Sequence, residues 1–95
     1  MNTPENFEWD KAKSDWTLQN RGFNFVFAAQ IFDGVVIEST DNRHDYGEDR
    51  IGAYGETEGI VLFVVYTVRG AKRRIISARL ASSKERENYH AIIKR

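Results

Sequence analysis

Four arginines lie on or beside the most apolar stretch of this 95-residue chain, which covers residues 60–80. They are Arg69, Arg73, Arg74 and Arg79. Burying an unpaired charge is costly, so an arginine this close to a core needs an anionic partner. The guanidinium group forms paired hydrogen bonds with carboxylates and phosphates alike and stays charged when it is desolvated. Two interpretations are therefore open: a carboxylate of the same chain, or a phosphate from outside.

Acidic and basic residues separate along the chain, although the net charge is zero. Residues 1–68 contain five Lys or Arg against twelve Asp or Glu, a net charge of −7. Residues 69–95 contain nine Lys or Arg against two Glu, a net charge of +7. A basic segment of this kind is typical of proteins that bind nucleic acid or an acidic protein. The alternative is that the two parts neutralise each other within the fold.

Length and composition exclude several classes of protein. We expect one domain that covers residues 1–95. The chain has no cysteine, which excludes a disulfide framework and thiolate catalysis and suits a reducing compartment. No apolar run approaches the roughly 20 residues that a membrane span needs, and the polar N-terminus is unlike a signal peptide. We therefore expect a soluble, cytoplasmic protein with no membrane partner.

The polar residues do not predict a cofactor or a metal site. The acidic residues between positions 41 and 49 match no metal-binding loop, such as that of an EF-hand. The seven glycines form no phosphate-binding fingerprint. His44 and His90 are expected at the surface. We predict that the chain functions without cofactor or metal.

The pattern of apolar and capping residues predicts five strands and three helices. Asp10 and Asn24 are expected N-caps, Gly22 ends the first helix, and Ser82 forms a capping box with Glu85. Strands are expected over residues 7–9, 35–40, 48–54, 60–68 and 73–80, and helices over residues 11–20, over residues 25–32 and after Ser82. Consecutive strands joined by short turns favour an antiparallel sheet. The expected fold is an α+β domain with two N-terminal helices and a C-terminal helix, in the order β-α-α-β-β-β-β-α.

Two local details accompany this prediction. Ala12 and Trp16, four residues apart, are expected on the buried face of the first helix. Residues 55–59 are expected to form the hairpin turn that leads into the long apolar strand.

Several motifs together resemble those of one toxin family. They are Phe7-Glu8-Trp9-Asp10-x-x-Lys13, Val64-Val65-Tyr66-Thr67-Val68-Arg69-Gly70, and Ile75-Ile76-Ser77-Ala78-Arg79-x-Ala81 followed by Glu85-Arg86-x-x-Tyr89. The last two are specific, because an ordinary strand does not require these sequences. On these motifs the chain resembles the BrnT toxins, which are RelE-like ribonucleases of type II toxin–antitoxin systems. It departs from the family pattern at Asn20-Arg21, where relatives have Lys-His, and at Lys11, where they have proline.

The resemblance implies a compact RelE-like domain and an endoribonuclease that cleaves RNA without metal, by attack of the 2′-hydroxyl. It also implies a BrnA-like ribbon–helix–helix antitoxin, through which alone the toxin would contact operator DNA. The rival hypothesis is a non-catalytic module that binds an acidic protein, or binds RNA without cutting it.

The resemblance also proposes site residues. Metal-free RNA cleavage needs a group that accepts the 2′-OH proton, cations that stabilise the phosphorane charge, and help for the leaving 5′-oxygen. The candidates are Arg50, Arg69 and Arg79 for catalysis, Arg73, Arg74 and Arg86 for RNA binding, and Tyr89 for proton transfer. No general base is predicted.

Each of these assignments has a structural alternative. For Arg79 the alternative is a salt bridge with Glu48 or Asp49. Arg69 would be an ordinary exposed turn residue, and Arg73 and Arg74 would lie on a solvated edge of the sheet. Tyr89 would be a core residue, since it begins the apolar stripe of the last helix.

Overall fold

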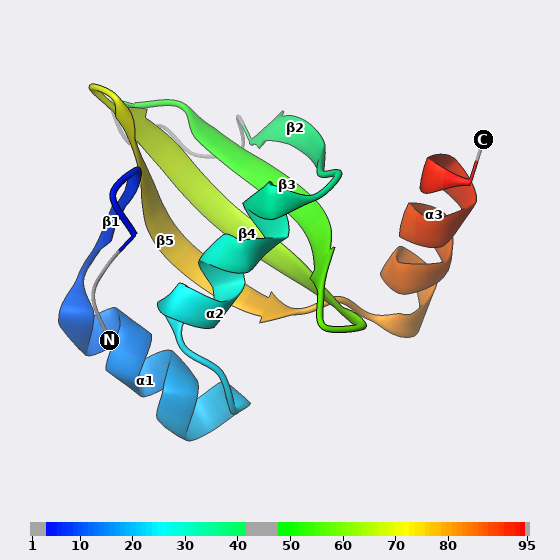
Figure 1. Cartoon of the computed structure of the whole chain (residues 1–95), viewed down its shortest axis with the longest axis horizontal. Helices are drawn as coiled ribbons and strands as arrows, with labels where there is room; N and C mark the ends of the chain where they lie inside the picture. Colours follow the sequence, from blue (N-terminus) through cyan, green and yellow to red (C-terminus); the bar gives the residue numbers. More distant parts are fainter. Residues whose placement is uncertain (1–3, 42–47, 95) are drawn as a thin grey trace.

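The computed structural model describes residues 4–41 and 48–94, which form one five-stranded sheet and three α-helices (Figure 1). The elements, in chain order, are β1 (Phe7–Trp9), α1 (Lys11–Arg21), α2 (Phe25–Ala29), the 3-10 helix η1 (Gln30–Asp33), β2 (Ile37–Asp41), β3 (Arg50–Thr57), β4 (Ile60–Arg69), β5 (Lys72–Leu80) and α3 (Ser83–Ile93). The prediction of an α+β fold class is confirmed.

The strands lie in the order β1-β5-β4-β3-β2. Strands β2 to β5 form an antiparallel meander, whereas β1 lies at the edge and pairs parallel to β5, with Phe7 opposite Arg73. The prediction of an antiparallel sheet is therefore wrong for β1. The expected order β-α-α-β-β-β-β-α also differs from the observed one, because it lacks the 3-10 helix η1 between α2 and β2; the strand β1 comes first and both N-terminal helices follow it. The strands β1 and β2 lie at opposite edges of the sheet because α1, α2 and η1 carry the chain across it between them.

Helix α1 begins and ends as its capping residues predict. The Asp10 carboxylate accepts the backbone N–H groups of Ala12 (2.8 Å) and Lys13 (3.4 Å). Gly22 has φ of 88° and donates its N–H to the Leu18 carbonyl at 3.1 Å, which is a left-handed cap that favours glycine. Both predicted ends are thus confirmed.

The predicted buried face of α1 is wrong. Trp16 is 52% exposed and Ala12 is also exposed, whereas Ser14 and Thr17 are buried. Ser14 Oγ accepts the Phe25 N–H at 3.0 Å, and Thr17 Oγ1 donates to the Lys13 carbonyl at 2.9 Å. Both hydroxyl groups are therefore satisfied, and their small size lets α1 lie close to the body while the larger tryptophan remains outside.

The second helix is shorter than expected, because the α-helix ends at Ala29 and η1 continues from there. Asn24 caps it by accepting the Phe27 N–H at 3.0 Å. Ile31 of η1 lies directly over β3: a Cβ atom at Gly55 would be 2.7 Å from the Ile31 Cβ. The absence of a side chain at Gly55 thus allows η1 to approach the sheet.

Strand β3 extends to Thr57, so the hairpin turn falls on Glu58 and Gly59 and not on residues 55–59. Both turn residues have positive φ, 48° and 79° respectively. Two consecutive residues of this kind are typical of the two-residue turn that matches the twist of antiparallel strands.

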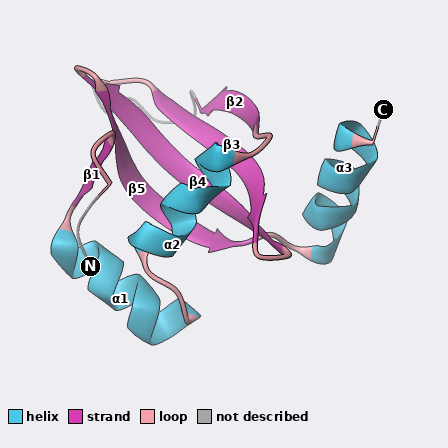
Figure 2. Ribbon diagram, in the orientation of Figure 1, coloured by secondary structure: helices cyan, strands magenta, loops and turns pink. Residues whose placement is uncertain are grey.

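The main core lies between the sheet and the helices α1 and α2 (Figure 2). Its largest fully buried side chains are those of Phe25, Ile31, Leu62, Val64 and Ile75. Helix α3 stands apart from α1 and α2 in Figure 2 and has a small core of its own, in which Tyr89 packs with Val61 and Ala81. The sheet therefore has one face covered by α1 and α2 and another face of which α3 covers only one end.

Candidate functional site

The sheet face opposite α1 and α2 carries most of the arginines of the strands. Tyr54 in β3, Phe63 in β4 and Arg79 in β5 are paired across the sheet, so they lie on the same face. Their neighbours along the strands, such as Val64, point into the main core. We call this surface the open face; by pairing and alternation it includes Arg50, Gly52, Tyr54, Phe63, Val65, Arg69 and Arg79. Arg74 also lies on it, because the register between β4 and β5 shifts by one residue at Val65 and Tyr66 and brings Arg74 opposite Thr67.

Glu85 holds the guanidinium of Arg79. Arg79 Nη1 donates to Glu85 Oε1 at 2.8 Å and Nη2 donates to Oε2 at 3.0 Å, so the pair is bidentate. Glu85 is directed there by the capping box of α3, in which its carboxylate accepts the Ser82 N–H at 2.8 Å. Arg79 thus has the carboxylate partner that one interpretation required, but the partner is Glu85 and neither Glu48 nor Asp49.

Two aromatic side chains complete the surroundings of Arg79. Its guanidinium lies 4.7 Å from the centroid of the Phe63 ring, a cation–π distance. The Tyr54 ring lies 4.6 Å from that of Phe63, and the Tyr54 hydroxyl donates to Glu85 Oε2 at 2.5 Å. Gly52 makes room for this arrangement, since a Cβ atom there would be 2.6 Å from the Phe63 ring.

The described contacts occupy only part of the Arg79 side chain. A guanidinium has five N–H donors. Glu85 accepts from two of them, and the Leu80 carbonyl accepts a third at 3.1 Å from Nη1. The Tyr54 hydroxyl also interacts with the guanidinium. The Arg79 side chain is 41% exposed and the contacts with Glu85 and Leu80 do not involve Nε, so the Nε side is where an oxyanion can bind. A guanidinium fixed in this way can bind a phosphate oxygen pair without reorienting.

These contacts shift the ionisation of the cluster. The Arg79 guanidinium, followed by the Ser82 N–H and the Tyr54 hydroxyl, lowers the pKa of Glu85 far below the usual range of a carboxyl group. Desolvation, followed by the hydrogen bond to Glu85, raises the pKa of the Tyr54 phenol. At neutral pH Glu85 is therefore ionised and Tyr54 is protonated.

Replacing Glu85 with glutamine is expected to remove a pH-dependent part of the stability. Because the folded pKa of Glu85 is lowered, its contribution is complete above its ordinary value of 4.5 and is lost as the pH falls through the lowered folded pKa. We expect E85Q to lower the free energy of unfolding by about 1 kcal/mol at pH 7, since the capping box and the partly exposed ion pair both weaken. Urea unfolding at pH 7 and pH 3 measures both effects.

The matched control is E87Q, because Glu87 is exposed on the same helix. We expect E87Q to follow the wild type at both pH values. If E85Q lost as much stability between pH 7 and pH 3 as the wild type does, the protonation of Glu85 would not be the cause of the lower stability at pH 3.

The other predicted arginines lie elsewhere. Arg69 and Phe63 are six positions apart on β4, so Arg69 is roughly 20 Å along the strand from the row that contains Arg79. Arg50 comes one position before Ile51, which pairs with Tyr66, so Arg50 lies toward the Arg69 end of the open face. The structure therefore brings Arg50 and Arg69 to one end of that face and Arg79 to the other.

The cations near Arg69 also have carboxylate neighbours. Arg69 Nη2 lies 3.4 Å from Glu48 Oε1 and its side chain is half exposed. Arg74, which pairs with Thr67 across the sheet, donates to Glu8 of β1 at 2.9 Å. These ion pairs partly neutralise the basic segment with the acidic part of the chain.

Arg73 lies on the side of α1 and α2 and not on the open face. Its guanidinium is 4.6 Å from the centroid of Phe32, 5.6 Å from that of Tyr66 and 5.9 Å from that of Phe7. Arg86 is exposed on α3, with a hydrogen bond of 3.4 Å to Ser83 Oγ. Arg73 therefore stabilises an aromatic cluster, whereas Arg86 remains accessible near the Arg79 end of the open face.

Tyr89, the candidate for proton transfer, is a core residue in the structure. It is 4% exposed, and its hydroxyl donates to the Val35 carbonyl at 2.7 Å. Burial raises the pKa of its phenol. His90 Nε2 lies 3.5 Å from Glu56 Oε1, and His44 falls outside the described residues. In the described part of the chain, no three His, Cys, Asp or Glu residues gather into a group that could hold a metal ion.

Tyr54 and Phe63 were not predicted as parts of this site, and Glu85 was predicted only as the partner of Ser82 in the capping box. A usable signal was present, because strand alternation from Arg50 to Tyr54 puts these two residues on one face. Nothing in the sequence indicated that the capping carboxylate of α3 also reaches Arg79, since this depends on how α3 leaves β5.

The fold and the site together define a small α+β domain with one sheet face that the described helices leave largely uncovered, on which arginine, aromatic and carboxylate side chains meet. The chain belongs to the BrnT family: residues 9–85 match the family model for the ribonuclease toxin, BrnT, of type II toxin–antitoxin systems. This membership implies an RNA-cleaving enzyme and a protein antitoxin as its partner. A comparison with curated proteins finds no match. Among the described helices, none is long and apolar enough to cross a membrane.

Proposed function

We propose that the chain is a metal-independent endoribonuclease toxin that cleaves RNA on the open face, with Arg79 as its main catalytic cation. The observation that carries this proposal is the geometry of Arg79, whose guanidinium is fixed by Glu85 and Phe63 and keeps one edge for an oxyanion. A preorganised donor at the point where charge develops is usually the largest electrostatic contribution to catalysis.

In the proposed reaction the 2′-oxygen of one nucleotide attacks the adjacent phosphorus and the bond from phosphorus to the 5′-oxygen breaks. The products are a 2′,3′-cyclic phosphate and a 5′-hydroxyl, and the proton lost from the 2′-OH is balanced by the proton gained by the leaving oxygen. Arg79 stabilises the charge on the non-bridging oxygens in between. Glu85 is a poor proton acceptor for this step because its pKa is lowered, so we assign it the positioning of Arg79.

The remaining cations are proposed to hold the RNA backbone. Arg50, Arg69 and Arg74 would contact phosphates at the far end of the open face, and Arg86 would extend the basic surface next to Arg79. Phe63 and Val65, both partly exposed between the two ends, offer an apolar surface for bases. The ion pairs with Glu48 and Glu8 would have to yield to phosphate, which makes binding dependent on salt concentration.

We also propose that the antitoxin is of the BrnA type, with a ribbon–helix–helix domain, that it silences the toxin in the cytoplasm, and that it alone contacts operator DNA. The resemblance of the sequence motifs and the family match support this assignment.

We expect the purified chain to cleave total RNA equally fast with and without EDTA, where EDTA is in about 10-fold excess over any added divalent metal. Equally fast means that the two rates agree roughly within a factor of two. The reason is that arginine, not a metal ion, supplies the positive charge. The experiment follows RNA fragments on a denaturing gel and identifies their 2′,3′-cyclic ends. A loss of cleavage that returns with added Mg²⁺ or Mn²⁺ would contradict metal independence.

A second candidate is a non-catalytic module, because each of Arg69, Arg74 and Arg79 already has a carboxylate partner within the chain. Under this hypothesis the wild-type chain would bind RNA or an acidic protein but leave RNA intact, and its expression alone would not arrest growth. The proposed toxin, in contrast, would arrest growth until the antitoxin is supplied.

A further inference from the structure

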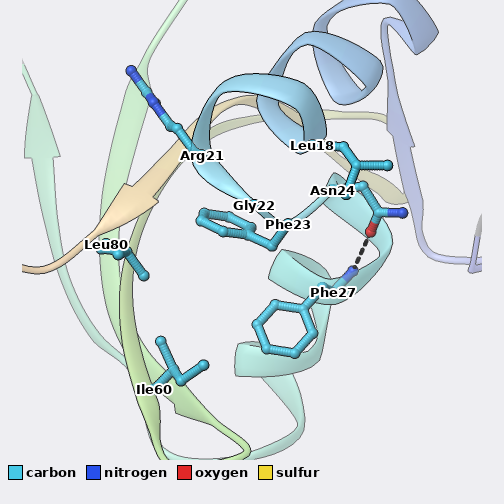
Figure 3. Close-up of a pocket in the computed structure, with 8 residues that line it drawn as sticks. All are labelled: Leu18, Arg21, Gly22, Phe23, Asn24, Phe27, Ile60 and Leu80. Carbon is cyan, nitrogen blue, oxygen red and sulfur yellow. Dashed lines mark hydrogen bonds between the residues drawn. The ribbon is translucent and has the colours of Figure 1, made fainter.

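An apolar groove lies on the side of the sheet that faces α1 and α2, at the end where β4 begins and β5 ends. Figure 3 shows the side chains that line it, which are Leu18, Arg21, Gly22, Phe23, Asn24, Phe27, Ile60 and Leu80. Its volume is about 540 Å³. Leu18, Ile60 and Leu80 are 48%, 41% and 53% exposed, so a large part of the apolar lining faces water.

The groove does not belong to the open face. Leu80 pairs with Leu62, which is part of the main core, so Leu80 lies on the opposite side of β5 from Arg79. The two surfaces are nevertheless adjacent, because positions 79 and 80 are consecutive. A bound chain that leaves the groove past Leu80 can therefore pass around the end of β5 and reach Arg79.

The charge of the groove lining restricts which kind of partner can bind there. Among the residues that the structure describes, Arg21 is the only charged one in the groove lining, and none of them contributes a carboxylate. In Figure 3 the Arg21 guanidinium points away from the groove; it lies 5.1 Å from the centroid of the Trp16 ring and donates to the Ala78 carbonyl at 2.7 Å, so it is held just outside the rim. A matching partner carries aliphatic side chains for the groove and an acidic residue for Arg21.

The other occupants fit less well. RNA would require several cations, and this lining supplies one. A second copy would offer the exposed Ile92 and Ile93 of α3. That helix region carries Lys84, Arg86 and Lys94 against Glu85 and Glu87, so its net charge is positive and matches Arg21 poorly. β1 pairs with only residues 73–75 of β5, so no described strand covers the β5 edge beside the groove.

We propose that this groove is the anchor site of the antitoxin, which binds it through an apolar segment with an acidic residue. This inference rests on the proposed function only in that the partner is a protein antitoxin of the kind that the family implies. The anchor leaves the open face to a neighbouring part of the same antitoxin, so that binding and inhibition use different residues of the toxin.

The experiment measures the affinity of the full-length chain for the antitoxin encoded beside it, by titration calorimetry. L18D and I60D each place a charge in the groove at an exposed position, and we expect each to weaken binding by at least about 10-fold. The matched control is V68D, because Val68 is 59% exposed at the opposite end of the sheet; we expect its affinity to stay within about twofold of the wild type.

The outcomes separate this inference from the proposed function. RNA cleavage by free L18D and I60D should equal that of the wild type, since neither residue belongs to the open face. If the antitoxin binds L18D, I60D and the wild type equally, or binds none of them, the anchor site is overturned. If the two variants instead lose affinity for RNA, the groove belongs to the substrate. If the antitoxin affinities change as expected while the wild type cleaves no RNA, the anchor site stands and the ribonuclease proposal fails.

Discussion

Replacing Arg79 with alanine is expected to lower the rate of RNA cleavage by about 10²–10³-fold, the range found when one preorganised oxyanion donor is removed. Arg79 is the arginine of the open face that the structure fixes by a bidentate ion pair together with an aromatic ring. The measurement is single-turnover cleavage of a defined RNA. We expect RNA affinity to change much less than the rate, because other cations hold the backbone.

Two further variants separate charge from geometry at this position. R79K keeps the positive charge but cannot pair with Glu85 in a bidentate manner and also offer a second edge, so we expect an intermediate rate. R79A leaves the Glu85 carboxylate without its cation, and this charge would repel RNA. The double variant R79A/E85Q removes that repulsion and is expected to remain as slow as R79A.

Two results would contradict the assignment of Arg79. One is an R79A protein that cleaves RNA at the wild-type rate. The other is a recovery of activity in R79A/E85Q, which would mean that repulsion by Glu85, not the loss of Arg79, had slowed the single variant. K84A, at an exposed position of α3, serves as the control for a general loss of positive charge.

Replacing Phe25 with alanine is expected to lower the free energy of unfolding by about 3–5 kcal/mol. Phe25 is 1% exposed, its ring meets that of Trp9 at 6.1 Å in an edge-to-face arrangement, and its N–H is bound by Ser14 Oγ. The alanine variant would leave a cavity between α2 and β5 and loosen the packing of α1 at the same time. Total stabilities of about 5–15 kcal/mol make this a large fraction.

Urea unfolding with an unchanged m-value measures this loss. F25L is the companion variant, since leucine fills most of the space and should cost roughly 1–2 kcal/mol; it keeps the test valid if F25A does not fold. An effect below about 1 kcal/mol for F25A would show that Phe25 is not a central core residue.

The features predicted best from the sequence are those that depend on residues close together in the chain. The caps at Asp10, Gly22, Asn24 and Ser82 all formed, because each is a local contact between a side chain or a left-handed residue and nearby backbone groups. Strand β4 was also predicted close to its observed bounds, since eight of its ten residues are apolar and such a run has few alternatives.

What the sequence did not reveal depends on contacts between distant segments. A three-residue strand such as β1 carries no information about its partner, so its parallel pairing with β5 was not expected. Trp16 was expected inside because it is four residues from Ala12 on one helix face, whereas satisfied hydroxyl groups at Ser14 and Thr17 occupy the buried positions. The three catalytic candidates came from a family resemblance, and strand register separates Arg79 from Arg50 and Arg69.

The pairing of β1 with β5 also has a consequence for how the chain is made. Glu8 and Arg74, which join the two strands, are 66 positions apart, whereas the contacts between β3, β4 and β5 are short-range hairpins. Closing so long a loop is slow in comparison with forming hairpins. A nascent chain that has not yet reached residue 75 has no strand with which β1 can pair, and its Phe7 and Trp9 remain without the β5 side chains that cover them. Completion of the sheet therefore waits until most of the toxin has left the ribosome.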